Sequence, residues 1–152
     1  MFTNLETYQS RFWLKEESLK KIGKSSSGFL LELFSRVDAL VDQDLVYYDH
    51  QMDMETCFEK YSFHEFKWHQ TPNGDMEWVF MLNRQGYLVD LAVAFYVTKE
   101  EKYLKKWKEI VFDFILENEK EISHPEASWR VLDAGIRLMN WVKSLTYLPL
   151  SE

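Results

Sequence analysis

Polar and aromatic side chains that could bind a ligand are concentrated in two otherwise apolar segments, residues 74–84 and 127–137. The candidate substrate-binding residues in these segments are Glu77, Asn83, Arg84, Trp129, Arg130 and Arg137. A helix that only packs has little use for such groups, because each buried polar group needs a partner. The two segments therefore predict either an ion-paired core or the wall of a polar ligand cleft.

The second segment places charged residues on one stripe of a helix, because Arg130, Asp133 and Arg137 are spaced i, i+3 and i+7. The planar guanidinium groups of Arg130 and Arg137 could bind a uronate or a sulfate. The same side chains could instead form an internal Arg–Asp–Arg network that locks helices together. Trp129 suits either stacking on a sugar ring or packing in the core, and Asn83 is expected to anchor a loop or a ligand.

Other patterns of catalytic and metal-binding residues are weak. Glu77 and Asp133 could form the carboxylate pair of a glycoside hydrolase, but two carboxylates are easily found among 25 acidic residues. The sequence contains no phosphate-binding glycine loop and no nucleophile elbow. We expect no metal site and no cofactor in this chain. The residues that could be considered as metal ligands are His50, Asp53, His64 and His69, but their spacing matches no strong zinc pattern.

The composition favours an all-α protein. Aromatic residues make up 16% of the chain, while five Gly and three Pro supply few turns for an all-β domain. Periodicity predicts helices over about 5–22, 27–42 and 75–97, the last capped by Asp75. A further helix is expected to start at a Thr98–Glu101 capping box, and another covers 127–147. Residues 44–74, between the second and third of these helices, are expected to be a long connection. It contains a short strand or an extended arm at 45–48 and a short helix at 54–61.

The last three expected helices alternate between interior and exterior positions. The helix over 75–97 is apolar around most of its circumference, the next has a solvated Lys and Glu face, and the last is again interior. This alternation is typical of paired helices in an (α/α) toroid. We therefore expect residues 1–152 to form one helical domain, an incomplete (α/α) toroid of inner and outer helix pairs cut from a longer protein. Residues 68–148 form its core, and 1–67 are less clearly patterned.

The charge and the apolar runs exclude several classes of partner. The net charge of −7 disfavours a nucleic-acid binder, which needs a basic surface. No uncharged apolar run approaches the roughly 20 residues that span a bilayer, and no signal-peptide pattern is visible. We expect a cytoplasmic protein without nucleic-acid or membrane partners. Cys57 is single, so it forms no internal disulfide and is expected to be a small buried hydrophobe.

Several motifs follow one another in order over residues 68–147. They are EWVFMLNR at 77–84, LAVAFYVT at 91–98 followed by Tyr103, SWR at 128–130 and GIR at 135–137. In this order they resemble the N-terminal helical region of the heparinase II/III family of polysaccharide lyases, which includes alginate and heparan-type lyases.

The resemblance implies an incomplete (α/α) toroid that a β-sandwich domain follows in the parent protein. It implies β-elimination at a uronic acid, in which a base removes the C5 proton, the carboxylate is neutralised and the leaving oxygen is protonated. In the family an Asn or His, a Tyr and a His do this work C-terminal to the matched motifs, so no catalytic residue is carried over. The implied partner is an anionic oligosaccharide or polysaccharide such as heparan, hyaluronan or alginate. The alternative is a non-catalytic helical module that binds carbohydrate or protein.

The last expected helix has no outer partner after it in the chain. Large exposed apolar patches commonly drive association. We therefore expect self-association through the C-terminal helix, which light scattering would detect. The residues expected to lack part of their cover are Trp141, Leu145, Tyr147 and Leu148.

Overall fold

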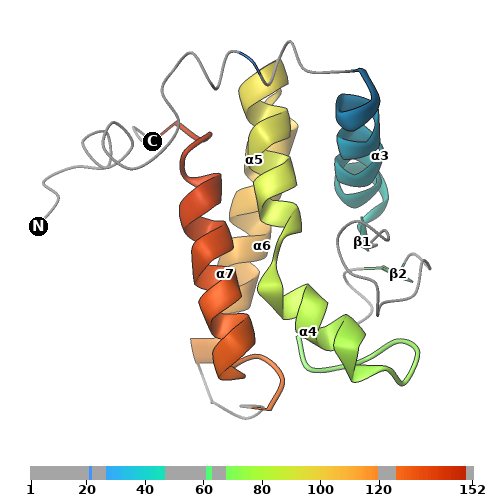
Figure 1. The fold of residues 1–152 in the computed structure, drawn as a ribbon, viewed down its shortest axis with the longest axis vertical. Helices are drawn as coiled ribbons and strands as arrows, with labels where there is room; N and C mark the ends of the chain where they lie inside the picture. The colour runs from blue at the N-terminus through green and yellow to red at the C-terminus, as the bar shows by residue number, and fades with distance from the viewer. Residues whose placement is uncertain (1–20, 22–26, 47–60, 63–67, 120–125, 150–152) are drawn as a thin grey trace, which may run out of the picture.

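The computed structural model describes residues 21, 27–46, 61–62, 68–119 and 126–149, which are mostly helical (Figure 1). This agrees with the predicted all-α class. Strands β1 (Leu45–Val46) and β2 (Tyr61–Ser62) pair antiparallel, with Leu45 opposite Ser62. The helices are α3 (Ser27–Gln43), α4 (Met76–Arg84), α5 (Tyr87–Thr98), α6 (Glu101–Glu119) and α7 (Val131–Ser144).

Helix α5 is the central element, and α3, α6 and α7 all pack against it (Figure 1). The predicted interior character of this segment is confirmed, because its buried side chains are distributed around the helix. The α5 side chains with no exposed surface are Leu88, Leu91, Ala92 and Ala94. A helix that is apolar on every side is stable only when neighbours cover every side, so α5 determines where the other helices lie.

Helix α6 is amphipathic, as its sequence predicts. Tyr103, Ile110 and Phe114 are buried, whereas Lys105 and Glu109 are exposed on the opposite face. The Phe114 ring makes edge contacts with Trp68 and Trp141, with centroids 5.0 and 6.0 Å apart. These contacts join α6 to α7 and to the segment that precedes α4.

Helix α3 packs through the predicted apolar stripe, and ion pairs fix it to its neighbours. Arg36 binds Asp90 of α5 at 2.9 Å, and Asp38 accepts hydrogen bonds from Tyr103 and Lys102 of α6 at 2.8 and 3.0 Å. Burial and the bond to Asp38 raise the pKa of Tyr103 to about 12. The buried or partly buried members of the stripe are Leu30, Leu33, Phe34, Val37 and Val41.

The prediction of one continuous helix over 75–97 is wrong, because the chain breaks between α4 and α5. Asp75 does cap α4, since its carboxylate accepts the Glu77 backbone N–H at 2.9 Å. Gln85 then adopts a left-handed conformation with φ 53° and ψ 39°, which ends α4. The Gln85 side chain is held in place by Trp141, whose indole N–H donates to Gln85 Oε1 at 2.5 Å.

Two other predicted helix boundaries also differ from the structure. Thr98 is the last residue of α5 and not the cap of the next helix, because Lys99 with φ 62° ends α5 there. The Thr98 hydroxyl still accepts the Glu100 backbone N–H at 3.1 Å, one residue before α6 begins. Helix α7 begins at Val131, because 126–129 form turns instead of the predicted first helical turn.

The connection before α4 is described only in part. The extended segment predicted over 45–48 contains β1, and Tyr61, placed at the end of the predicted short helix, lies in β2. The rest of that short helix, the predicted first helix apart from Lys21, and Cys57 lie outside the described residues.

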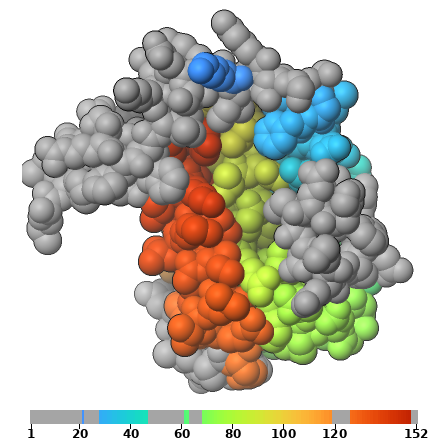
Figure 2. Space-filling view, in the orientation of Figure 1, coloured from blue at the N-terminus to red at the C-terminus, as the bar shows by residue number. Residues whose placement is uncertain are grey.

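Helix α7 buries polar residues and exposes apolar ones. The buried residues of α7 are Asp133, Arg137, Asn140 and Ser144. Its exposed large apolar residues are Val131, Leu132, Leu138 and Met139. In Figure 2, α7 forms a large part of the visible face beside α4 and α5. The described elements therefore cover α7 on one side, and the predicted interior position applies to that side only.

Of the four residues near the C-terminus that were expected to lack part of their cover, three are partly exposed and one is buried. Leu148 is buried at 6% exposure, and Trp141, Leu145 and Tyr147 are half-buried. The exposed apolar surface lies instead on α7 itself, and self-association through this helix stays a prediction. None of the helices in the described part of the chain is long and apolar enough to cross a membrane.

We predict opposite effects of alanine at two glycines. Gly135 lies in α7, and an added Cβ would meet no atom within 4 Å, so Gly135→Ala should stabilise the protein by about 0.5–1 kcal/mol. Gly74 has φ 81°, where a Cβ is strained, so Gly74→Ala should destabilise it by about 1 kcal/mol. Urea denaturation of both variants measures the two changes. A loss of stability in Gly135→Ala would show that α7 tolerates no side chain at this position.

Candidate functional site

The break between α4 and α5 leaves backbone carbonyls at the end of α4 without helical donors. Two polar residues of α7 supply those donors. Arg137 Nη1 donates to the Asn83 carbonyl oxygen at 3.0 Å, and Asn140 Nδ2 donates to the Arg84 carbonyl oxygen at 2.8 Å. The buried polar stripe of α7 is thus matched to the free end of α4.

An ion-pair network joins the same two helices. Asp133, whose side chain has no exposed surface, binds Arg84 Nε through Oδ1 at 2.7 Å and lies 2.9 Å from Arg130 Nε through Oδ2. Arg84 Nη2 also lies 3.3 Å from Glu77 Oε1. An Arg–Asp–Arg network therefore exists as one interpretation predicted, but Arg84 takes the place expected of Arg137. Asp133 has no surface to offer a sugar, which weighs against a glycosidase pair of Glu77 and Asp133.

Asn83 anchors the segment that precedes α4. Its amide donates to the Trp68 carbonyl oxygen at 2.6 Å and to the Val79 carbonyl oxygen at 2.9 Å. The residue has no exposed surface. The predicted role as a loop anchor is confirmed, and direct contact with a ligand stays a prediction.

Arg137 lies between aromatic rings. Its guanidinium carbon is 4.3 Å from the Phe114 ring centroid and 5.2 Å from that of Trp129. Burial lowers the pKa of Arg137 to about 10, so the group remains cationic at neutral pH. Trp129 is 40% exposed, whereas Arg137 is 4% exposed. The indole therefore forms the accessible edge of a buried cationic and aromatic cluster.

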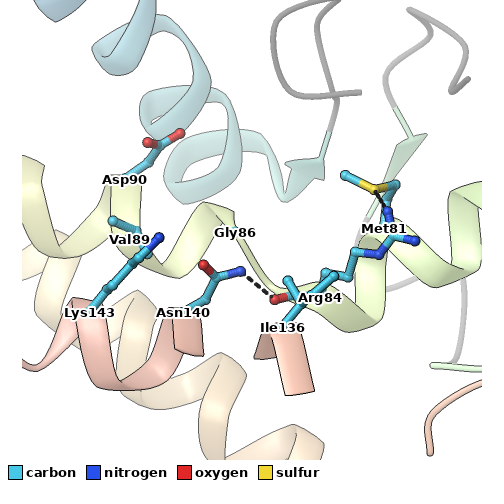
Figure 3. Close-up of a pocket in the computed structure, with 8 residues that line it drawn as sticks. All are labelled: Met81, Arg84, Gly86, Val89, Asp90, Ile136, Asn140 and Lys143. Atoms are coloured by element: carbon cyan, nitrogen blue, oxygen red, sulfur yellow. Dashed lines mark hydrogen bonds between the residues drawn. The ribbon is translucent and has the colours of Figure 1, made fainter. Parts of the chain in front are cut away.

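Two cavities flank α7 on different sides. The first, which we call the aromatic cavity, has a volume of about 330 Å³ and includes Trp129 and Arg137. The second, which we call the Lys143 cavity, has a volume of about 370 Å³ and lies where α7 meets the α4–α5 break (Figure 3). The residues of the aromatic cavity are Phe114, Trp129, Ala134, Arg137, Leu138 and Trp141. Those of the Lys143 cavity are Met81, Arg84, Gly86, Val89, Asp90, Ile136, Asn140 and Lys143.

The structure brings the six predicted site residues together at the α4–α7 contact, but only some of them line a cavity. Trp129 and Arg137 line the aromatic cavity, and Arg84 lines the Lys143 cavity. Arg130 is partly exposed, with its guanidinium 3.8 Å from the centroid of the Phe80 ring. The remaining two predicted residues line neither cavity. Glu77 pairs with Arg84, and Asn83 donates a hydrogen bond to the segment that precedes α4.

Sequence reasoning missed Asn140 and Lys143, which line the second cavity. The sequence does contain a signal for Asn140, because it continues the stripe of Asp133 and Arg137 by one turn of helix. Lys143 follows three residues later and is an ordinary last-turn lysine by sequence.

The described residues contain no group of three or more His, Cys, Asp or Glu side chains that could hold a metal ion. Of the four residues considered for a metal site, His69 is described. The other three, His50, Asp53 and His64, lie outside the described residues.

Comparison with known proteins identifies the family. A family model for the heparinase II/III N-terminus matches residues 13–152. The chain belongs to this family. The match begins well before the motifs at 77–84, so the heparinase II/III N-terminal region also includes residues 13–67 of the less clearly patterned part of this chain. No curated protein and no solved structure matches the chain.

We predict that Asp133→Asn destabilises this heparinase II/III region by about 3 kcal/mol. The substitution leaves Arg84 and Arg130 without the buried carboxylate that lies between them. Urea denaturation measures the change, with Glu117→Gln on the exposed side of α6 as the control, expected within about 0.5 kcal/mol of the native protein. Equal stability of the two variants would mean that the network contributes little to the fold.

Proposed function

We propose that this chain is the N-terminal helical part of a polysaccharide lyase that cleaves uronic-acid-containing saccharides by β-elimination. Membership of the heparinase II/III N-terminal family carries this proposal. In the proposed lyase, the helices of this chain belong to an incomplete (α/α) toroid. The residues that abstract and return protons follow the motifs matched here, so the part of this chain is to bind and orient the saccharide.

We assign saccharide binding to the aromatic cavity. Trp129 presents a partly exposed indole at this cavity, and the apolar face of a sugar ring packs well on such a surface. Arg137, cationic at neutral pH, lies 5.2 Å from the same ring and provides a positive charge for a uronate carboxylate. A volume of about 330 Å³ lies within the usual range of small-molecule sites.

The direct test is the activity of the full-length protein. It is incubated with heparan, hyaluronan and alginate oligosaccharides, and the ultraviolet absorbance of the unsaturated product is followed. We expect product from at least one of these uronides. A folded protein that forms no product from any of them would contradict the lyase assignment, and binding without product would favour the alternative, a carbohydrate-binding module.

A variant tests the role of the aromatic cavity. Trp129→Ala removes the stacking surface, so KM should rise by about three- to tenfold while kcat changes little. The control is Phe112→Ala, which removes an exposed aromatic side chain from α6 outside both cavities. Equal KM values for the two variants, both folded by circular dichroism, would remove Trp129 from the binding site.

A further inference from the structure

The Lys143 cavity has an apolar lining and a polar end. Met81, Val89 and Ile136 supply apolar surface to it. In Figure 3 the Lys143 amine and the Asn140 carboxamide extend from α7 toward α5 and lie on the same side of the cavity, whereas the Arg84 guanidinium points away toward Met81. The cavity thus combines a surface for a ring with polar groups at one edge of it.

Lys143 is the charge in this cavity that has no counter-charge. Within the part of the chain that the structure describes, the Lys143 amine has neither a hydrogen bond nor an ion pair. The other charged groups of the cavity are compensated. Asp90 binds Arg36 at 2.9 Å, and Arg84 is paired with Asp133 and Glu77. The charged side chains that line the cavity are Arg84 and Lys143, which are positive, and Asp90, which is negative, so the lining has an excess of one positive charge that attracts an anion.

Asn140 provides a fixed acceptor next to this charge. Its amide nitrogen donates to the Arg84 carbonyl oxygen at 2.8 Å, which sets the orientation of the carboxamide. The amide oxygen is turned to the side of Lys143 (Figure 3) and has no hydrogen-bond donor among the described residues. A carboxamide oxygen in this position accepts a hydroxyl hydrogen.

The backbone at the break adds to the positive field. Gly86, which lines the cavity, is the residue before the first turn of α5, and a helix N-terminus carries a partial positive charge. Lys143 in the last turn of α7 also interacts favourably with the dipole of its own helix. That interaction does not explain why Lys143 lines a cavity next to the Asn140 acceptor.

We propose that the Lys143 cavity binds an anionic sugar residue, distinct from the one bound at Trp129. The Lys143 amine binds its carboxylate, Asn140 Oδ1 accepts one of its hydroxyl groups, and the ring packs on the apolar lining. A volume of about 370 Å³ accommodates a ligand of this size. The choice of a sugar as the anion rests on the proposed function, whereas the anion-binding character rests on the cavity alone.

The test is an NMR titration of the chain with glucuronate, and with glucose as the neutral probe. Glucuronate should shift the signals of the Asn140 side chain and of the Gly86 amide, and glucose should shift them at least tenfold more weakly. Lys143→Met keeps an unbranched apolar stem but removes the charge, so glucuronate affinity at these signals should fall about tenfold. Lys105→Met, on the exposed face of α6, is the control and should bind as the native chain does.

Equal affinity in Lys143→Met and Lys105→Met, or equal shifts with glucose and glucuronate, would overturn the proposal. Shifts confined to the Trp129 and Arg137 signals would overturn it too, while leaving the proposed function intact. Conversely, glucuronate binding that depends on Lys143 in a protein without lyase activity would support this site and refute the proposed function.

Discussion

The break in the backbone at Gln85 is the constraint on which the arrangement of the helices depends. Only Gln85 and Gly86 separate the end of α4 from the start of α5, and the break leaves the carbonyl groups of Asn83 and Arg84 turned away from any helical donor. Both accept hydrogen bonds from α7, across 54 and 56 residues of sequence. Unsatisfied buried carbonyls are costly, so α7 can pack in few orientations other than the one observed.

This constraint explains why α7 has its polar side inward. Asp133, Arg137 and Asn140 must face α4 to make these bonds, and the apolar residues Leu138 and Met139 are then left on the outside. The same orientation of α7 places Arg137 and Trp141 toward α6, where the aromatic cavity lies. It places Asn140 and Lys143 toward α5, where the Lys143 cavity lies. Both candidate binding cavities are therefore supported by interactions whose main role is structural. Arg137 in the aromatic cavity and Asn140 in the Lys143 cavity are preorganised in this way, because their hydrogen bonds to α4 hold them before any ligand arrives.

The sequence predicts the parts of the fold that depend on local pattern. The apolar character of α5, the amphipathic α6 and the cap at Asp75 follow from residue type and spacing, and all three agree with the structure. The break at Gln85 does not follow, because left-handed conformations favour glycine and the neighbouring Gly86 is instead right-handed. Tertiary hydrogen bonds from Asn140 and Trp141 of α7 stabilise that conformation, and no local window of sequence contains them.

The same division applies to the candidate site. Clustering of Glu77, Arg84 and Arg130 was predictable from polar residues in apolar helices, and so was a network around Asp133. Which arginine pairs with Asp133 depends on how two helices face each other, so the sequence did not distinguish Arg84 from Arg137. The cavity at Lys143 was missed because its residues come from three helices and it exists only where these meet at the break.

The order of synthesis gives the break a further consequence. A ribosome releases α4 and α5 before α7, and at that stage the carbonyls of Asn83 and Arg84 have only water or the next turn of helix as partners. The nascent segment 76–98 is therefore expected to favour one uninterrupted helix, and the arrival of α7 converts it into the bent pair.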